Sequence, residues 1–287
     1  MVLRLATVEG NHCWLYTLRS VLQTVVSDDL LSVDNLQVSL DSRKGPRVAI
    51  LDGLTFVVGR GEFVSVMGPS GCGKSTLLNV LAGFQKPTAG TVVYRGAEIG
   101  GPSAERGVVF QSPALFPWLT SLGNAMFGPL ARGVEKKQAR AEALALLHEV
   151  GLSHATERHP YELSGGMKHR LALARTLANR PELLLMDEPF AALDAETRFG
   201  MQVLLLGLSE RHKMTVIFVT HDIEEGLLLA DRVLVLGGRP ARVRKCIKVH
   251  AARPRDPDIV LTTEFVALRK QLRALMVELS DSGQGSI

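Results

Sequence analysis

Short apolar runs alternate with longer stretches of helical periodicity over most of the chain. The runs at 62–67, 183–186, 215–219 and 232–236 predict β-strands. The second run is continuously apolar and lies between Pro181 and an acidic pair, which indicates a central parallel strand buried on both faces. Because strands that alternate with helices build parallel sheets, the pattern predicts an α/β fold with a mostly parallel sheet.

Helical spacing of apolar residues predicts the elements between these strands. A long helical stretch, 112–178, interrupts the alternation of strands and helices, and we expect a helical subdomain there. Within it, residues 112–130 carry three prolines and predict an exposed, irregular loop. The predicted helices lie at 77–82, 135–150, 168–178, 195–209, about 222–230 and 262–280.

An antiparallel layer is predicted ahead of the first parallel strand. Residues 31–40 and 48–58 each predict a strand, and Gly45-Pro46 between them predicts a turn. Short strands are also predicted at 91–94 and 107–110. The chain is therefore expected to pass through antiparallel structure before it enters the parallel sheet.

Residues 1–29 form an addition before this layer. Apolar residues from Leu15 to Val26 fall at helical spacing. Two interpretations stay open for the segment: an amphipathic helix that docks on a partner or a membrane surface, and a loosely attached tail.

Composition limits the classes of protein that fit. A chain of 287 residues, 46% of them hydrophobic, suits one large domain, or a domain with a subdomain, around a large core. It contains no apolar run of roughly 18 residues or more and no secretory leader pattern, so we expect a cytosolic protein without a membrane span. The three cysteines are far apart and indicate neither a disulfide framework nor a metal site.

The charge balance adds one local feature. The formal net charge of +4 is too small to indicate a nucleic-acid partner, and none is expected. Residues 239–255, however, contain seven arginines and lysines and no acidic residue. Two interpretations stay open for this basic run: a solvated face, and a surface that meets anionic lipid headgroups or an acidic partner.

Residues 68–76 fit the phosphate-loop pattern G-x-x-x-x-G-K-[ST], and they lie between a predicted strand and a predicted helix. Such glycines let the backbone wrap a phosphate, while the helix start adds free N–H groups and a positive dipole end. Lys74 is expected to reach the β- and γ-phosphates, and the Ser75 hydroxyl to ligate Mg²⁺. The predicted nucleotide contacts are Gly68, Pro69, Ser70, Gly71, Cys72, Gly73, Lys74, Ser75 and Thr76.

Further polar residues follow the other predicted strands. Ligands collect at the carboxyl ends of parallel strands, and Gln111, Asp187, Glu188 and His221 are expected there. Asp187 suits a Mg²⁺ ligand, and Glu188 suits the general base that polarises the attacking water. His221 can hydrogen-bond the γ-phosphate, and Gln111 can contact the metal or the water. The pattern predicts nucleotide hydrolysis.

The segment Leu163-Ser164-Gly165-Gly166-Met167 resembles the signature motif of the ATP-binding cassette (ABC) ATPases. The phosphate loop, Gln111, this segment, 184–188, 192–194 and His221 occur in that family's order. The resemblance implies a P-loop NTPase (RecA-like) core that binds ATP and Mg²⁺. It also implies a homodimer in which Ser164, Gly165 and Gly166 face the γ-phosphate bound by the second copy, with Asp194 at the interface.

The resemblance covers about residues 32–240 and gives a domain organisation. We expect an N-terminal extension at 1–31, an ABC ATPase domain at 32–240 with a helical subdomain at about 112–178, and a basic and helical C-terminal tail at 241–287. Two departures from the family pattern occur. Met167 stands where the family commonly has Gln, and residues 41–50 offer no aromatic ring for adenine, so Arg47 or Val48 is expected there or base binding is weaker.

Within the family, residues 101–111, 115–118, 187–194 and 221–226 resemble the importers for nitrate, sulfonates and taurine. The implied partners are integral-membrane permease subunits and, indirectly, a solute-binding protein, with the chain peripheral on the cytoplasmic face of the cell membrane. Phe116 and Trp118 are expected either to form a docking patch for the permease or to pack within the helical subdomain. The transported solute is not encoded here.

Two other functions remain open. A soluble ABC ATPase in cofactor assembly or nucleic-acid maintenance has the same motifs. A small-molecule kinase has the same phosphate loop, but it leaves residues 164–166 and Asp194 without a role.

Overall fold

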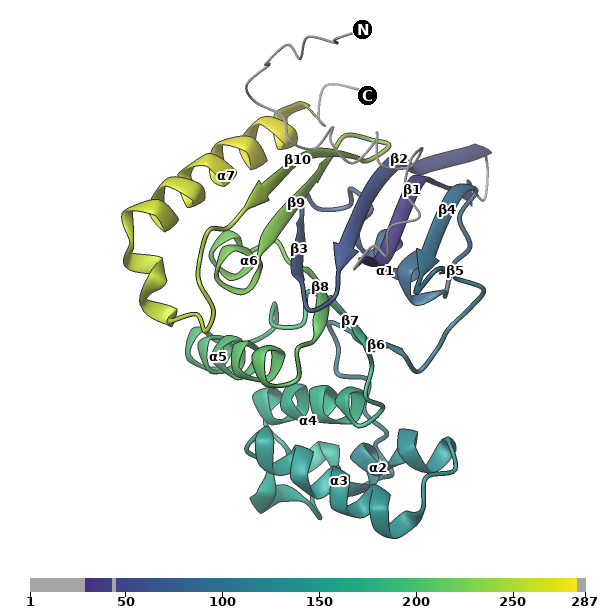
Figure 1. Cartoon of the computed structure of the whole chain (residues 1–287), viewed down its shortest axis with the longest axis vertical. Coiled ribbons are helices and arrows are strands. Elements are labelled where there is room, and N and C mark those ends of the chain that lie inside the picture. Colours follow the sequence, from purple (N-terminus) through teal and green to yellow (C-terminus); the bar gives the residue numbers. More distant parts are fainter. Residues whose placement is uncertain (1–28, 43–44, 283–287) are drawn as a thin grey trace, which may run out of the picture.

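The computed structural model describes residues 29–42 and 45–282. Its centre is a six-stranded sheet in the order β10-β9-β3-β8-β7-β6, in which all neighbours are parallel except β10 against β9 (Figure 1). The strands predicted from the apolar runs are confirmed. The bounds are β3 (Phe63–Met67), β6 (Arg106–Val109), β7 (Leu183–Asp187), β8 (Thr215–Val219), β9 (Arg232–Gly237) and β10 (Arg242–Lys248).

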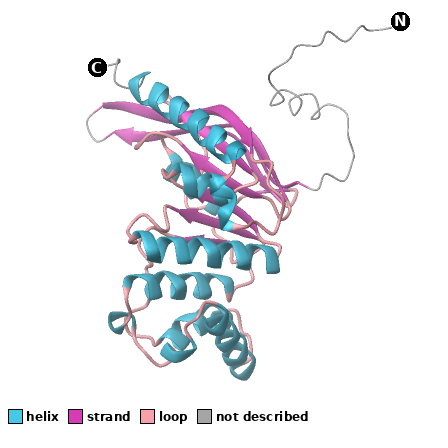
Figure 2. Ribbon diagram, turned by 90° about the vertical axis from the view of Figure 1, so that its left-hand side faces the viewer, coloured by secondary structure: helices cyan, strands magenta, loops and turns pink. Residues whose placement is uncertain are grey.

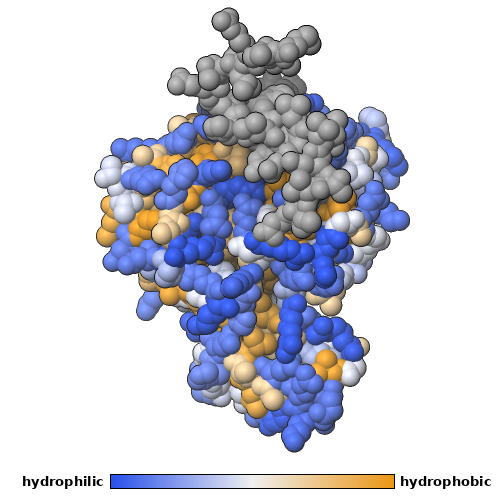
Figure 3. All heavy atoms as spheres, in the orientation of Figure 1, coloured by the Kyte–Doolittle hydropathy of each residue, from blue (hydrophilic) through white to orange (hydrophobic). Residues whose placement is uncertain are grey.

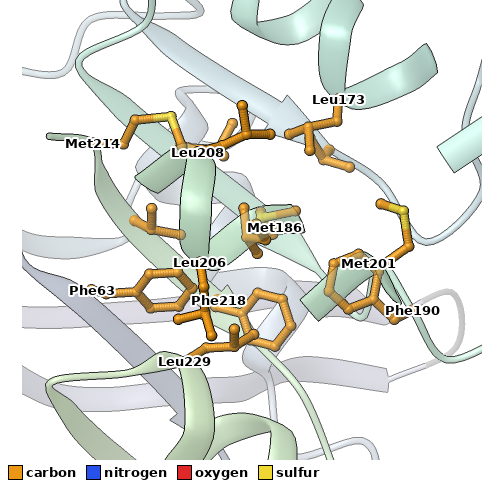
Figure 4. Close-up of a cluster of buried hydrophobic side chains, with 14 of the residues drawn as sticks. Phe63, Leu173, Met186, Phe190, Met201, Leu206, Leu208, Met214, Phe218 and Leu229 are labelled. Carbon is orange, nitrogen blue, oxygen red and sulfur yellow. The ribbon is translucent and has the colours of Figure 1, made fainter. Parts of the chain in front are cut away.

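The middle of this sheet is buried on both faces. Every residue of β3 and β8 is buried, which explains why these strands are continuous apolar runs. Alternate side chains enter different cores: Val64 packs under the second sheet, and Phe63 packs under the helices. Figure 4 shows the second of these cores, where the Phe63 and Phe190 rings lie 5.9 and 5.8 Å from the Phe218 ring.

A second, antiparallel sheet confirms the predicted N-terminal layer. Its order is β2-β1-β4-β5, and α1 (Lys74–Ala82) packs in the core that this sheet shares with the larger one. The α/β fold with a mostly parallel sheet is confirmed as well. The bounds of the layer are β1 (Asp29–Ser42), β2 (Gly45–Gly59), β4 (Ala89–Tyr94) and β5 (Ala97–Glu98).

Helices form the rest of the molecule. In the lower part, α2 (Ser121–Ala131), α3 (Lys136–Glu149) and α4 (Gly165–Leu177) pack on one another as a separate layer below the sheets (Figure 1). Figure 2 shows helices covering the face of the large sheet that is turned away from the second sheet. These helices are α5 (Ala195–Arg211), α6 (Ile223–Leu229) and α7 (Thr263–Ser282). Short 3₁₀ helices lie at Ser153–Ala155, Pro160–Glu162 and Pro257–Leu261.

Helix α2 corrects the prediction of an irregular loop over 112–130. Thr120 caps the helix, because its hydroxyl accepts a hydrogen bond from the Gly123 N–H at 3.1 Å. The buried Asn124 amide donates to the carbonyl oxygens of Phe116, Leu119 and Thr120. Pro129 lies in the last turn, where it removes a single helix hydrogen bond.

The basic run 239–255 is part of the fold. It contains β10, a strand that the sequence did not predict, so the large sheet continues into the segment expected to be a tail. Arg253 and Arg255 both pair with Asp231, at 2.9 and 3.2 Å, and the Arg255 side chain is only 1% exposed. Arg242 pairs with Asp52. Arg253 and Arg255 are therefore held in the fold by Asp231, while the other five basic residues of the run are exposed and both interpretations stay open for them.

The helix predicted between Leu15 and Val26 lies outside the described residues. Among residues 29–42 and 45–282, no helix combines the length and apolar character that crossing a membrane requires.

Asp231 gives a test of how this region is held together. Its carboxylate accepts from Arg253, from Arg255 and from the Phe63 N–H at 2.8 Å. Asp231→Ala leaves the buried Arg255 charge without its partner, so we expect it to lower the free energy of unfolding by about 2–3 kcal/mol. Asp52→Ala, which removes the partner of the largely exposed Arg242, is the matched control and should cost less than about 1 kcal/mol. Urea unfolding followed by circular dichroism measures the free energy of unfolding of both variants. Equal losses in Asp231→Ala and Asp52→Ala would contradict the inference that Asp231 stabilises the fold by pairing with the buried Arg255.

Candidate functional site

The phosphate loop, residues 68–73, joins the end of β3 to the start of α1. Two of its glycines are fixed by close packing. A Cβ on Gly68 would lie 2.6 Å from the Leu236 carbonyl oxygen, and one on Gly73 would lie 2.8 Å from Leu51 Cδ2. Gly73 also has a φ of 106°, which favours glycine. The N-terminus of α1 therefore opens directly from a tight glycine loop, an arrangement that binds phosphate.

Lys74 is the first residue of α1, and its side chain is buried within this loop. Its Nζ donates to the carbonyl oxygens of Gly68 at 2.8 Å and Pro69 at 3.1 Å. The positive charge is thus held against the loop that would carry a phosphate. Cys72 is buried in the same loop. Burial raises the pKa of its thiol, and the positive charge of Lys74 opposes that shift. Cys72 is therefore a small core residue in this loop. Among the other residues of the segment 68–76, Ser70, Gly71 and Ser75 are exposed, whereas Pro69 and Thr76 are half-buried.

Ser75 and Asp187 bring two oxygen ligands together. Asp187 ends β7, and its carboxyl lies close enough to the Ser75 side chain on α1 for that hydroxyl to influence its pKa. Burial raises the pKa of Asp187 from its usual range, and the Ser75 hydroxyl and the Lys74 charge oppose the rise. A hydroxyl and a carboxylate beside a phosphate loop are the oxygen donors that Mg²⁺ takes when it binds together with a nucleotide. These residues fit that metal.

Glu188 follows at the same edge in a strained backbone conformation. Its φ is 43°, which costs a non-glycine residue about 1–3 kcal/mol and is common at functional sites. The Glu188 N–H donates to the Val219 carbonyl oxygen at 2.9 Å, which ties the strained residue to the end of β8. Its Oε2 lies 3.1 Å from Nδ1 of His221. The carboxylate is therefore directed toward His221, two residues after the end of β8.

Gln111 follows β6, and its side chain is exposed. Its carbonyl oxygen lies 3.3 Å from Nε2 of His169, a buried residue of α4, and Nδ1 of the same ring lies 2.9 Å from the Gly165 carbonyl oxygen. Both ring nitrogens are thus within hydrogen-bonding distance of a backbone carbonyl oxygen. His169 thus links the loop at Gln111 with the start of α4. Sequence reasoning missed it, although its position four residues after Gly165 is the spacing of one helical turn.

Ser164 and the two glycines after it begin α4. The Ser164 hydroxyl caps the helix by accepting from the Met167 N–H at 3.3 Å. A Cβ on Gly165 would meet nothing within 4 Å, whereas one on Gly166 would lie 2.5 Å from Thr197 Cγ2. The first glycine therefore faces open space, and the second allows α4 to approach α5. Both are at a helix N-terminus, where backbone N–H groups can bind an anion.

Asp194 caps α5 next to that contact. Its Oδ1 accepts from the Thr197 N–H at 2.9 Å, and this hydrogen bond lowers the pKa of the exposed carboxyl. Its position places a permanent negative charge at a helix N-terminus, where it is favourable.

The predicted site residues fall into two groups. The loop 68–76 with Asp187, and Glu188 with His221, gather at the carboxyl ends of β3, β7 and β8. Residues 164–166 and Asp194 stand apart: among the described residues, no hydrogen bond or ion pair joins them to the loop 68–76. Gln111 is linked to the second group, because His169 contacts the backbone carbonyl oxygens of both Gln111 and Gly165.

A sheet of this topology with a phosphate loop after its central strand defines a P-loop NTPase. The family model described as "ABC transporter" matches residues 51–191. The taurine import ATP-binding protein TauB of Jannaschia sp. is 47% identical over 259 residues, which is 89% of this chain and 97% of that protein. An uncharacterized ABC transporter ATP-binding protein of Methanocaldococcus jannaschii is 47% identical over 242 residues, 84% of this chain and 89% of that protein.

Solved structures agree. The dimeric ATP-binding cassette MJ0796, in a post-hydrolysis state bound to ADP and Pi, is 32% identical with a TM-score of 0.68 and covers 77% of this chain and 100% of its own. The cbiO1 protein of Clostridium perfringens, part of an ABC transporter complex, is 27% identical with a TM-score of 0.70, over 88% of this chain and 98% of its own. The chain belongs to the ABC transporter family, and it is an ATP-binding subunit with ATPase activity.

His169 can be tested through turnover. His169→Leu removes both ring nitrogens and leaves an apolar side chain that can stay buried but makes neither hydrogen bond. We expect ATP turnover to fall about fivefold, which corresponds to roughly 1 kcal/mol, because the loop at Gln111 loses its link to α4. ATP affinity should be unchanged, and His169→Gln should recover part of the turnover by restoring one donor.

Steady-state kinetics with a binding titration separates the two quantities. The exposed His154 provides the control, because His154→Leu changes the same residue type away from this link. Wild-type turnover in His169→Leu would show that the link has no part in the reaction.

Proposed function

We propose that the chain is the ATP-hydrolysing subunit of a multi-subunit importer, in which two copies enclose two ATP molecules and drive separate permease subunits. The observation that carries the hydrolytic part is the Glu188–His221 contact of 3.1 Å beside the Ser75–Asp187 pair. The proposed domain spans residues 32–240, to which β10 adds an edge strand.

Each residue at this sheet edge has a proposed role. Lys74 and the loop amides bind the β- and γ-phosphates. Ser75 and Asp187 would hold Mg²⁺, with Gln111 nearby, and the metal supplies charge neutralisation for phosphoryl transfer when it is bound. Glu188 accepts the proton of the attacking water as general base. His221 hydrogen-bonds the γ-phosphate and holds the Glu188 carboxylate in place.

The second copy completes the site in this proposal. Ser164, with the amides of Gly165 and Gly166, binds the γ-phosphate held by the partner, since their helix N-terminus is exposed and Gly165 faces open space. The reciprocal pairing makes the interface two-fold symmetric. Asp194 lies at that interface. The dimeric state named for the MJ0796 cassette supports this arrangement.

The permease would dock on an aromatic patch at the loop before α2. Phe116 lies 5.5 Å from the Trp118 ring and 4.4 Å from the Phe127 ring, with the Arg175 guanidinium 5.3 Å from its centroid. Phe116 is thus held within the helical subdomain, whereas Trp118 is 69% exposed. The packing of Phe116 agrees with the expectation of a ring within the helical subdomain, and the exposure of Trp118 supports the proposed docking patch. An anchored ring beside an exposed one provides a rigid aromatic site for a partner.

The solute class follows from the relatives. Two of those that match at 47% identity are named taurine import proteins, so taurine or a related small sulfonate is the proposed solute, with nitrate as the other member of the class. The subunit would then act at the cytoplasmic face of the cell membrane. A soluble role in cofactor assembly or nucleic-acid maintenance is the competing function.

Glu188→Gln tests the catalytic assignment. Gln keeps the hydrogen-bonding shape but cannot accept the proton, so turnover should fall at least 100-fold, about the least that a general base contributes. ATP binding should remain, and gel filtration with ATP should show an accumulated dimer. Glu264→Gln, an exposed change on α7, is the control. Undiminished hydrolysis in Glu188→Gln would disprove the assignment of the base.

Trp118→Ala tests the docking patch and the transport function together. Affinity purification of the wild-type chain from its membranes should recover a polytopic membrane subunit, and Trp118→Ala should recover several-fold less of it. Val277→Ala, an exposed apolar change on α7, serves as the control. Recovery of nucleic acid or of an assembly scaffold in place of a membrane subunit would contradict the proposed importer function.

A further inference from the structure

Among residues 45–51, the described strand segment that reaches the phosphate loop, no side chain is aromatic. The strand segment that packs on this loop places Ile50 and Leu51 against Gly73. Before them, Val48 is 52% exposed and the Arg47 guanidinium is paired with Asp41 at 2.8 Å. None of these side chains offers the flat π-surface on which bases stack.

An exposed ring is found instead in front of the signature segment. Tyr161 is 75% exposed, more than any other aromatic side chain of the described residues. One face of its ring is stacked on His159, with ring centroids 5.5 Å apart and planes inclined by 15°. The two rings form a double layer of π-surface on the outside of the molecule.

The turn that carries Tyr161 is rigid. The Glu162 carboxylate accepts from the His159 N–H at 2.6 Å, and the Leu163 N–H donates to the Pro160 carbonyl oxygen at 3.2 Å. Leu163 is buried and anchors the end of the turn. A ring on a fixed turn loses little conformational entropy when it binds a ligand, so it is a preorganised binding surface.

The short chain separation of Tyr161 and Ser164 limits which part of a nucleotide the ring can meet. This step rests on the proposed function, in which Ser164 of one copy contacts the γ-phosphate held by the other. Tyr161 lies three residues earlier, and three residues span at most about 11 Å. The ribose and triphosphate separate the base from the terminal phosphate by a similar length. Tyr161 therefore lies within reach of the base of the nucleotide whose γ-phosphate Ser164 binds.

We propose that Tyr161, supported by His159, stacks on the purine base of the nucleotide held by the phosphate loop of a second copy of this chain. The ligand class is a purine nucleoside triphosphate. Stacking recognises the size of the π-face rather than its edge groups, so the ring adds affinity without choosing adenine over guanine. Pyrimidine nucleotides, with a smaller face, gain less from it.

The test uses the full chain carrying Glu188→Gln, in which the proposed function expects ATP-bound dimers to accumulate. The ATP concentration for half-maximal dimer formation, measured by analytical ultracentrifugation, should rise about tenfold on adding Tyr161→Ala. This is the loss of a stacking contact of about 1.4 kcal/mol. Tyr161→Phe should restore the original value, because it keeps the ring. Leu261→Ala, an equally exposed apolar change near α7, should have no effect.

A second measurement separates stacking from a structural effect. The same titration is repeated with CTP. Tyr161→Ala should raise the CTP concentration for half-maximal dimer formation less than it raises the ATP concentration, so the preference of the chain for ATP over CTP should become smaller. Equal shifts for both nucleotides, or an unchanged ATP value, would overturn the stacking proposal while the dimer itself stands. If the parent Glu188→Gln chain forms no dimer with ATP, the proposed two-copy site fails instead, and Tyr161 has no base to meet.

Discussion

The position of β3 in the middle of the large sheet constrains everything at the site. Its backbone is hydrogen-bonded to β8 on one side and to β9 on the other, and all of its side chains are buried. Its carboxyl end is therefore fixed relative to the ends of its neighbours. The loop that follows is held in turn by the contact of Gly68 with the Leu236 carbonyl, at the end of β9. The loop and the side chains after β7 and β8 thus share one rigid edge, which preorganised catalysis requires.

Much of this edge could be predicted from the sequence because its signals are local. A phosphate loop between a strand and a helix, and acidic residues after a continuous apolar run, identify themselves within a few residues. The strained φ of Glu188 and its tie to Val219 have no such signal, because they depend on the pairing of β7 with β8. His169 was missed for the same reason: its partner at Gln111 is 58 residues away.

The basic run shows where charge patterning alone is misleading. Its counter-ions, Asp52 and Asp231, lie outside the run, and no local pattern connects them with it. The strand β10 was hidden by the same arginines and lysines, since an edge strand can carry charged side chains on its exposed positions. Helix α2 was hidden by Pro129, whose cost depends on its place in the helix. The fold class was predictable, whereas these elements needed tertiary contacts.

The two glycines of the signature segment, Gly165 and Gly166, have different structural roles. Gly166 lets α4 approach Thr197 and so positions Asp194 near the same surface, while Gly165 leaves the helix N-terminus open to a ligand. With Tyr161 three residues earlier, the segment would combine the proposed anion site and a π-surface on one short stretch of chain. In the proposed dimer, the second copy then contacts the nucleotide at its γ-phosphate and at its base. Hydrolysis removes the contact with the γ-phosphate but leaves the base stacked on Tyr161. The dimer would therefore separate first at the N-terminus of α4 and only then release the nucleotide.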